Sequence, residues 1–588
     1  MKSYKVIKHK ILGITMTKKL SFINQNTFVI CFRLLLSAII VLIVTLNFNL
    51  YKPMWGIIAA LFLQLRPETG FVIEKALCLV AGTFIGIVVG CLILFLFIGQ
   101  PIPSFICLVI FLCACSLISA GINHSNLVYG IALGNITTII VVLYSISDPQ
   151  NITIVNALNF ASARLIEICI GATAACISSF LIKPYSVKRI YQNHSKQLLN
   201  ATIKHLISLT STQPNSFCVN LATRDILEST IAIHNDSSAS IYEKLATKNN
   251  HVLFSNKALP FLRLIKDYCK YIESNNSLEF QSYAEILNAQ LSKISHSDTK
   301  SVIKTLRKFS KLTNTPIVIK NIYLALIELL LAYNSLNNFK KPLYELKLNR
   351  IKNYYNPIII ATATARNVAI FLVCALIWSI SGGSLGMLLA TAIMTLLSQL
   401  FVGIPNAFLL VKKVLMGLLI SVPIALIVKF CFIYQFTESF KHLLFFFCLG
   451  LSAGVVLLSI SKLQMYGLGY CLGFVFVVQP SNQMSFNVTP SLSICLGLIF
   501  GGGVFYVVYK LLPNAPNIIT QKLALLSLYG DYKKIGKTIT TREQFSIKVA
   551  KKALCVYKYQ LHDNFESSYI VKRLHRLLER SNKKLGDL

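Results

Sequence analysis

Ionisable side chains are scarce inside the apolar stretches of this 588-residue sequence, and Arg164 and Glu167 form the clearest pair. A charged group in an apolar stretch is costly unless it has a partner or a polar cavity. These two side chains are three residues apart, so on a helix they share one face and can form an ion pair. Apolar surroundings also favour the protonated form of a carboxyl group. The spacing therefore predicts either a structural ion pair or a site of proton exchange at Glu167.

The densest polar cluster is QLRPETGFVIEK, residues 64–75, which lies between two apolar stretches. Pro67 and Gly70 predict a break in the helix, and charged side chains crowd the turn. One interpretation is a salt-bridged loop that fixes a tight helical hairpin. The other is a binding site whose cations attract an anion, and its side chains would be Gln64, Arg66 and Lys75.

Two arginines, Arg33 and Arg366, each lie near the start of an apolar stretch. A guanidinium group suits bidentate binding of a carboxylate, and equivalent positions in the two halves of the chain predict a symmetric pair that binds an anionic substrate. The alternative is that both side chains extend to the membrane interface. For Lys429, close to the end of another apolar stretch, the expected role is an interfacial anchor.

Twelve apolar stretches must position these residues, and most are long enough for a helix that crosses about 30 Å of hydrocarbon. In the third stretch, Gly82, Gly86 and Gly90 recur every fourth residue, so they line one helical face where another helix can approach closely. The predicted helices form two clusters of six: 28–49, 54–65, 76–98, 102–120, 127–146 and 160–182, then 363–381, 384–402, 409–432, 441–460, 465–480 and 490–511.

The two clusters have the features of a duplication, since Gln64 and Gln399 fall at similar places in them. Six spans in each half give parallel repeats related by an axis along the membrane normal. We expect an all-α integral membrane protein of about 12 transmembrane helices in two such repeats, with a helical cytoplasmic domain between them. The expected divisions are 1–27 (cytoplasmic N-terminus), 28–182 (first half), 183–355 (cytoplasmic helical domain), 356–511 (second half) and 512–588 (cytoplasmic helical tail).

The composition agrees with a membrane protein. Hydrophobic residues make up 55% of the chain and charged residues 13%, against about 25% charged in soluble proteins. The net charge of +35 comes from lysines concentrated in the N-terminal, middle and C-terminal polar segments, which the count of spans places on one side. This is the positive-inside distribution, so we expect these segments and both termini in the cytoplasm, near anionic lipid headgroups, and no binding of nucleic acid.

Sequence motifs for catalysis or metal binding are lacking. The 16 cysteines contain no CxxC pair, and GDYKKIGKT (530–538) has five residues between its glycines where a P-loop needs four. We therefore expect no enzymatic activity, no metal and no cofactor. If the protein is a transporter, we expect transport to be driven by an ion gradient or to be passive.

Residues 54–90, MWGIIAALFLQLRPETGFVIEKALCLVAGTFIGIVVG, resemble the fusaric acid resistance family, which includes the aromatic acid exporters of bacterial inner membranes. The resemblance covers the whole chain in its order of six spans, domain, six spans and tail. Leu79 departs from it, because the family often has an arginine there. Plant aluminium-activated malate transporters look distantly similar in their six-span half. The matching positions are Trp55, Gln64, Arg66, Lys75, Gly82, Thr83 and Gly86.

The resemblance implies export of small organic, chiefly aromatic, carboxylates across the bacterial inner membrane, driven by protons. It also implies a periplasmic adaptor protein as a partner, and a homo-oligomer is left open. In this interpretation Arg66 and Lys75 attract the anion, Arg33 and Arg366 hold it, and Glu167 exchanges a proton. The alternatives are a gated organic-anion channel on the same fold and a non-transporting scaffold whose cytoplasmic domain binds lipid or protein.

Overall fold

The computed structural model describes residues 25–50, 52–97, 99–122, 124–147, 154–182, 186–210, 216–236, 242–243, 254, 256–261, 264, 299–311, 316–337, 354–402, 404, 407–436, 440–482, 484–513, 515–536, 538–539, 541–560 and 565–585. Most of the predicted N-terminal segment and much of the predicted domain 183–355 lie outside the described residues. The chain forms two compact units, one from Met1–Tyr185 and Ile359–Asn514 and the other from Ser186–Ile358 and Ala515–Leu588.

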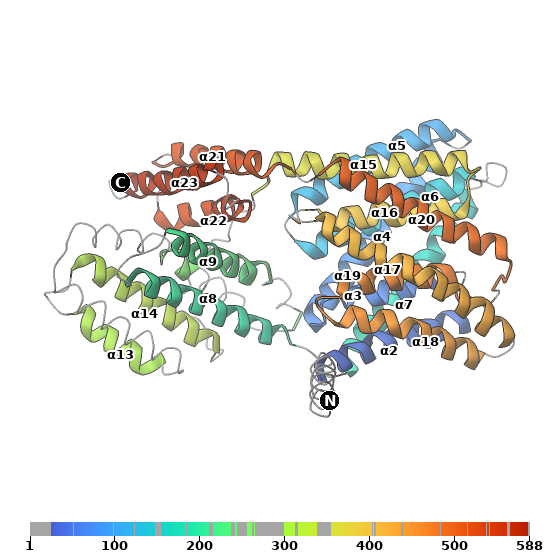
Figure 1. The fold of residues 1–588 in the computed structure, drawn as a ribbon, viewed down its shortest axis with the longest axis horizontal. Helices are drawn as coiled ribbons and strands as arrows, with labels where there is room; N and C mark the ends of the chain where they lie inside the picture. Colours follow the sequence, from blue (N-terminus) through green and yellow to red (C-terminus); the bar gives the residue numbers. More distant parts are fainter. Residues whose placement is uncertain are drawn as a thin grey trace, which may run out of the picture. The chain divides into compact units, whose positions relative to one another are not determined.

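The described part of the first unit is helical and falls into two halves (Figure 1). The first half contains α2 (Gln25–Asn47), α3 (Met54–Leu63), α4 (Thr69–Leu96), α5 (Pro101–Gly121), α6 (Ser125–Ser147) and α7 (Ile154–Leu181). The second contains α15 (Pro357–Ile380), α16 (Leu385–Leu400), α17 (Ala407–Ile427), α18 (Phe440–Ser459), α19 (Gln464–Val478) and α20 (Val488–Leu511), and a π-helix, Val428–Ile433, continues α17.

Ten described helices are long and apolar enough to cross a membrane. Nine lie in the first unit, and the tenth, α14 (Ile317–Asn337), belongs to the second unit. Three further apolar helices of the first unit, α3, α16 and α19, are shorter. The predicted all-α integral membrane fold is confirmed, whereas the count of 12 spans stays a prediction because it depends on the three short helices.

The start of α4 differs from the sequence prediction. The helix begins at Thr69 instead of residue 76, so Gly70 and Lys75 lie in its first two turns. A single glycine costs a helix only about 1 kcal/mol relative to alanine, and the first turn has no intrahelical partners for its N–H groups. The break therefore comes from Pro67 and the turn around it.

Helices α4 and α6 run parallel and touch through their backbones. A methyl group added at Gly82 or Gly86 would lie closer than 3.0 Å to the carbonyl of Gly130 or Gly134, respectively. Gly90, two turns beyond Gly82, faces the same helix. Lipid chains are as apolar as leucine, so close packing of small residues is what holds such helices together.

The same helix pairs are in close contact in both halves. Helix α3 crosses α7 at Gly56 and Gly171, and α16 crosses α20 at Gly386 and Gly497. The pair α4 and α6 has its counterpart in α17 and α19, where Gly469 lies against the backbone of α17. A repeated pattern of glycine crossings in the same order of helices is what a duplication would produce.

The two halves run in the same direction. The Asn482 side chain, just after α19, donates a hydrogen bond to the carbonyl of Leu46 at the end of α2, over 2.6 Å. Gly383, just after α15, lies beside Ser147 at the end of α6. Because successive helices alternate in direction, these contacts place the C-terminal ends of α2, α6, α15 and α19 on one side, as parallel repeats require.

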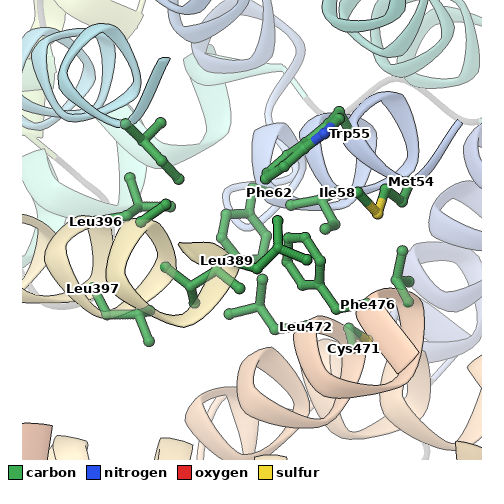
Figure 2. Packing of buried hydrophobic residues seen from close by; sticks show 14 of the residues in the cluster. Met54, Trp55, Ile58, Phe62, Leu389, Leu396, Leu397, Cys471, Leu472 and Phe476 are labelled. Carbon is green, nitrogen blue, oxygen red and sulfur yellow. The ribbon is translucent and has the colours of Figure 1, made fainter. Parts of the chain in front are cut away.

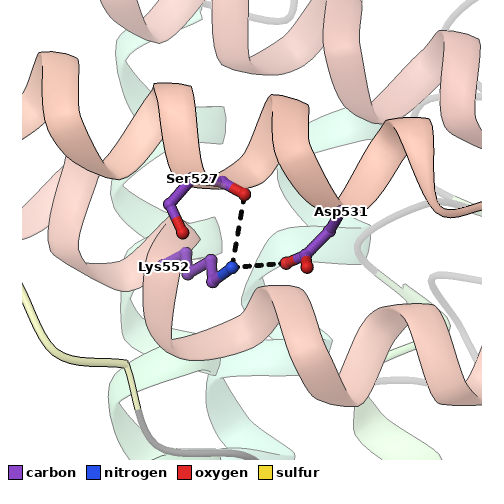
Figure 3. A network of polar contacts seen from close by, with 3 residues as sticks. All are labelled: Ser527, Asp531 and Lys552. Atoms are coloured by element: carbon purple, nitrogen blue, oxygen red, sulfur yellow. Dashed lines mark hydrogen bonds and ion pairs between the residues drawn. The ribbon is translucent and has the colours of Figure 1, made fainter.

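The second unit contains α8 (Val187–Thr210), α9 (Ser216–Asp236), α13 (Thr299–Ser310), α14, α21 (Asn517–Lys533), α22 (Arg542–Lys558) and α23 (Phe565–Lys584). One of its apolar clusters joins α9 to α21, α22 and α23. A polar contact also holds α22 on α21, since Lys552 forms an ion pair with Asp531 and donates to the carbonyl of Ser527 over 3.3 Å (Figure 3).

Two glycines of α20 allow the crossings to be tested. In Gly497→Ala the new methyl group would collide with the backbone of α16, whereas a methyl at Gly503 meets nothing within 4 Å. Overpacking of this kind costs about 1–3 kcal/mol, so we expect a lower melting temperature for Gly497→Ala. Gly503→Ala, the matched control, should be neutral or slightly stabilising because alanine favours helix. Thermal unfolding of the purified full chain checks this, and equal melting temperatures for the two variants would contradict the packing argument.

Candidate functional site

A closed apolar barrier occupies the centre of the first unit, where the three short helices meet (Figure 2). Its side chains are no more than 7% exposed. The rings of Trp55 and Phe476 meet edge to face with centroids 5.1 Å apart, which joins the two halves. Helix α3 has 10 residues and is therefore about 15 Å long, half the thickness of the hydrocarbon. The barrier includes Met54, Trp55, Ile58 and Phe62 of α3, Leu389, Leu396 and Leu397 of α16, and Cys471, Leu472 and Phe476 of α19.

A cavity of about 550 Å³ lies at the C-terminal end of α3, and we call it the Arg66–Lys75 cavity. Both halves line it, with Arg66, Lys75 and Tyr129 from the first and Leu400 and Gln464 from the second. Arg66 is exposed and Lys75 half-buried. The structure thus brings together the two cations that the sequence analysis selected for attracting an anion.

Lys75 also holds the end of α3. Its Nζ donates to the carbonyl of Phe62 over 2.6 Å and lies 4.1 Å from the centre of the Tyr129 ring. A cation at the C-terminus of a helix is favourable because the last carbonyl groups carry partial negative charge. The neighbouring Glu74 accepts a hydrogen bond over 2.8 Å from Asn126 of α6, which lines the cavity, and its other oxygen lies 3.3 Å from Nε2 of His124.

Arg33 and Gln64 surround the turn between α3 and α4 without being among the described residues that line this cavity. The buried guanidinium of Arg33 donates to the carbonyl of Pro67 over 2.7 Å. Gln64 donates to the hydroxyl of Ser178 on α7 over 3.2 Å. Both side chains therefore fix the turn that carries Arg66.

Arg366 is buried between α15 and α20, with its guanidinium carbon 4.7 Å from the centre of the Tyr509 ring. It too is absent from the described lining of the Arg66–Lys75 cavity. Close by, Asn367 and Gln399 both donate to the hydroxyl of Ser116 on α5, over 2.6 and 3.3 Å. This end of the second half is thus tied to the first half by uncharged polar groups.

A second cavity, of about 650 Å³, lies at the opposite ends of α3 and α19. We call it the Lys52–Lys429 cavity. Lys52 and Met54 line it from the first half, and Lys429, Gln479 and Ser481 from the second. Two cavities with basic side chains therefore face each other across the apolar barrier.

Lys429 is not the interfacial anchor that its place in the sequence predicts. Its side chain is 4% exposed and its Nζ donates to the hydroxyl of Ser491 on α20 over 2.9 Å. The cause is local, because Lys429 lies in the π-helix that follows α17, where an extra residue per turn rotates the side chains relative to α-helical register. An α-helical pattern cannot predict that inward direction.

Glu167 lies near the middle of α7, 13 residues after Ile154 and 14 before Leu181. It is buried, and its Oε1 accepts a hydrogen bond from the backbone N–H of Lys52 over 2.5 Å. Because Lys52 lines the second cavity, this carboxyl group lies directly behind the cavity wall.

Arg164, one turn before Glu167, makes different contacts from those expected. Its guanidinium carbon lies 3.9 Å from the centre of the Trp55 ring, and its Nε donates to Thr137 of α6 over 3.4 Å. Among the described contacts there is no direct ion pair with Glu167, since the connector between α2 and α3 supplies the partner of that carboxylate. The i, i+3 spacing places both side chains on one face of α7, but it cannot show which other segments contact them.

Sequence reasoning missed Lys52 as a site residue and gave Lys429 a different role. Both stand at ends of apolar stretches on the side where the positive-inside pattern predicts few basic residues. Basic residues on that side depart from the positive-inside pattern, and this departure is the sequence signal that could have identified them as site residues. As for metals, the described residues contain no group of three His, Cys, Asp or Glu side chains that could hold one.

Comparison with known proteins agrees with this architecture. The model of the fusaric acid resistance protein family matches residues 27–531. Relatives include the p-hydroxybenzoic acid efflux pump subunit AaeB of Yersinia enterocolitica, 22% identical over 512 residues that cover 82% of this chain and 75% of that protein. The protein of the same name from Erwinia billingiae is 23% identical over 523 residues, covering 84% and 77%. No solved structure matches.

The family match covers most of the chain and agrees with the resemblance of residues 54–90. The protein therefore belongs to the fusaric acid resistance protein family.

Proposed function

We propose that this protein is a bacterial inner-membrane exporter of small organic, chiefly aromatic, carboxylates, driven by protons. The observation that carries the proposal is the pair of basic cavities at opposite ends of a closed apolar barrier. An exporter needs a binding site that opens to each side in turn and a barrier that is never open to both. The names of the relatives, p-hydroxybenzoic acid efflux pump subunits, support the substrate class.

The orientation follows from the positive-inside rule. With the basic N-terminal segment in the cytoplasm, the start of α2 faces the cytoplasm. Arg33, near that start, contacts the turn at Pro67, so the Arg66–Lys75 cavity opens on the cytoplasmic side and the Lys52–Lys429 cavity on the periplasmic side. Both termini are cytoplasmic in this proposal.

In the proposed cycle, the anion enters from the cytoplasm and meets Arg66 and Lys75, while Arg33 and Gln64 keep their turn in place. The two halves then rock about the contacts of α3, α16 and α19. This motion opens the barrier toward the periplasm and releases the anion. Because the relatives are named as subunits, a partner such as a periplasmic adaptor belongs to the proposal, as does a homo-oligomer.

Glu167 is the proposed coupling group. A carboxylate accepts the N–H of Lys52 more strongly than a neutral carboxylic acid does, since charged hydrogen bonds are the stronger ones. A proton from the periplasmic cavity that binds Glu167 would therefore loosen the connector between α2 and α3 at the edge of the barrier. Release of that proton to the cytoplasm would close the cycle.

The decisive experiment is uptake of labelled p-hydroxybenzoate into inverted membrane vesicles with an imposed pH gradient. Accumulation that a protonophore abolishes supports proton-driven export. Flux that follows voltage without a pH gradient favours the gated channel instead. An absence of flux above that of empty vesicles, with the relevant partner supplied, would favour the scaffold.

Replacing Glu167 by glutamine removes the proton site and keeps the shape of the side chain. We expect Glu167→Gln to insert normally but to lose accumulation driven by the pH gradient. Glu328→Gln, which removes an exposed carboxylate of the second unit, should behave as wild type and is the control. Gradient-driven accumulation by Glu167→Gln at the wild-type level would exclude the coupling role.

Arg66 is exposed in its cavity, so its replacement should affect binding more than folding. A charge-assisted hydrogen bond contributes about 1.5–3 kcal/mol, so Arg66→Gln should raise the KM for p-hydroxybenzoate about tenfold or more. Lys412→Gln removes an exposed positive charge on α17 and is the matched control. If initial uptake rates in inverted vesicles gave the same KM for both variants, Arg66 would not contact the anion.

A further inference from the structure

The Lys52–Lys429 cavity contains a buried cation, Lys429, for which the described residues provide no counter-charge. Lys429 is 4% exposed, and among the described residues no carboxylate lies within ion-pair distance of its amine. An ammonium group has three N–H donors, and the described hydrogen bonds give one of them an acceptor, the hydroxyl of Ser491; the amine also lies 5.9 Å from the centre of the Phe430 ring. A buried charge of this kind is costly without a counter-charge.

The backbone around the cavity is also unusual. The described part of the chain has two residues other than glycine with positive φ, Asn49 at 51° and Gln479 at 48°, and both line this cavity. Asparagine tolerates this conformation, whereas glutamine adopts it at a cost of about 1–3 kcal/mol. Lys429 itself is held in a π-helix, a rare element that is frequent at functional sites. Backbone strain is costly to stability, so its concentration around one cavity indicates that the local geometry is kept for a function such as binding.

The lining also provides what a small carboxylate needs. Two lysines approach from different halves, and amide and hydroxyl groups of Gln479, Ser481 and Ser485 stand beside them. The described lining adds apolar surface from Leu50, Met54 and Ile494, and the Lys52 amine lies 5.6 Å from the centres of the Tyr144 and Phe160 rings, which stand outside the lining. A volume of about 650 Å³ falls in the range of small-molecule sites.

We infer that this cavity is a second anion-binding site, in which Lys429 binds the carboxylate of a small aromatic acid on its way out. This inference deepens the proposed function and rests on it for the substrate class. An anion there bridges the two halves, because Lys52 and Lys429 come from different halves. Binding would therefore favour the state in which the barrier is closed behind the departing anion.

Binding of p-hydroxybenzoate to the purified full chain in lipid nanodiscs tests the inference by calorimetry. The background is Arg66→Gln, which weakens the other cavity. In this background Lys429→Met should lower the remaining affinity about tenfold or more, and Lys429→Arg should retain most of it. Lys441→Met is the matched control, since Lys441 is an exposed lysine at the nearby start of α18. Unchanged affinity in Lys429→Met, or no binding by the wild-type chain, would overturn the inference.

Two additions keep the result interpretable. Lys429→Gln retains a donor for Ser491 and so protects the fold, yet it should lose affinity as Lys429→Met does; retained affinity in a folded Lys429→Gln protein would overturn the inference. Transport in vesicles is measured separately. If the Lys429 variants lose binding but the wild-type protein transports nothing, the second binding site is supported and the exporter is rejected. If the wild-type protein transports the acid but the Lys429 variants bind it as well as before, the exporter is supported and the second binding site is rejected.

Discussion

Contact of backbone with backbone at glycines is the constraint on which the rest of the first unit depends. Inside a membrane the hydrophobic effect gives a helix little reason to exchange its contacts with lipid for contacts with another helix. Van der Waals contact at close approach must therefore provide the attraction. The crossing of Gly56 and Gly171 holds the short helix α3 against the middle of α7. Only at that distance can the connector before α3 reach Glu167, and only then do the two ends of α3 border the two cavities.

Much of this architecture could be predicted from the sequence. The apolar stretches identify the helices, and the spacing of Gly82 and Gly86 identifies a contact face. The cluster at residues 64–75 contains two of the cations that line one cavity. The rest depends on other elements. The direction of Lys429 results from a π-helix, the partner of Glu167 comes from a connector distant in sequence, and the burial of Arg366 against Tyr509 is a tertiary contact.

The two halves share their packing but not their chemistry. Gly56 faces the backbone carbonyl of Glu167, and the corresponding Gly386 faces that of Ser493. A glutamate in the first half thus corresponds to a serine in the second half. The buried lysine, Lys429, belongs to the second half. In the proposed cycle the shared packing provides the hinge, and the differences place the proposed proton site, Glu167, in the first half and the proposed release residue, Lys429, in the second.

The shortness of α3 has an electrical consequence. Where water fills the cavities at both ends of a helix of 10 residues, the membrane voltage falls across about 15 Å instead of about 30 Å. The local field is then about twice as strong as in plain bilayer. Moving one charge through it changes the energy by about 2.3 kcal/mol per 100 mV. In the proposed orientation, an anion that leaves a negatively charged cytoplasm moves with the field, so the resting potential would itself drive it outward past α3.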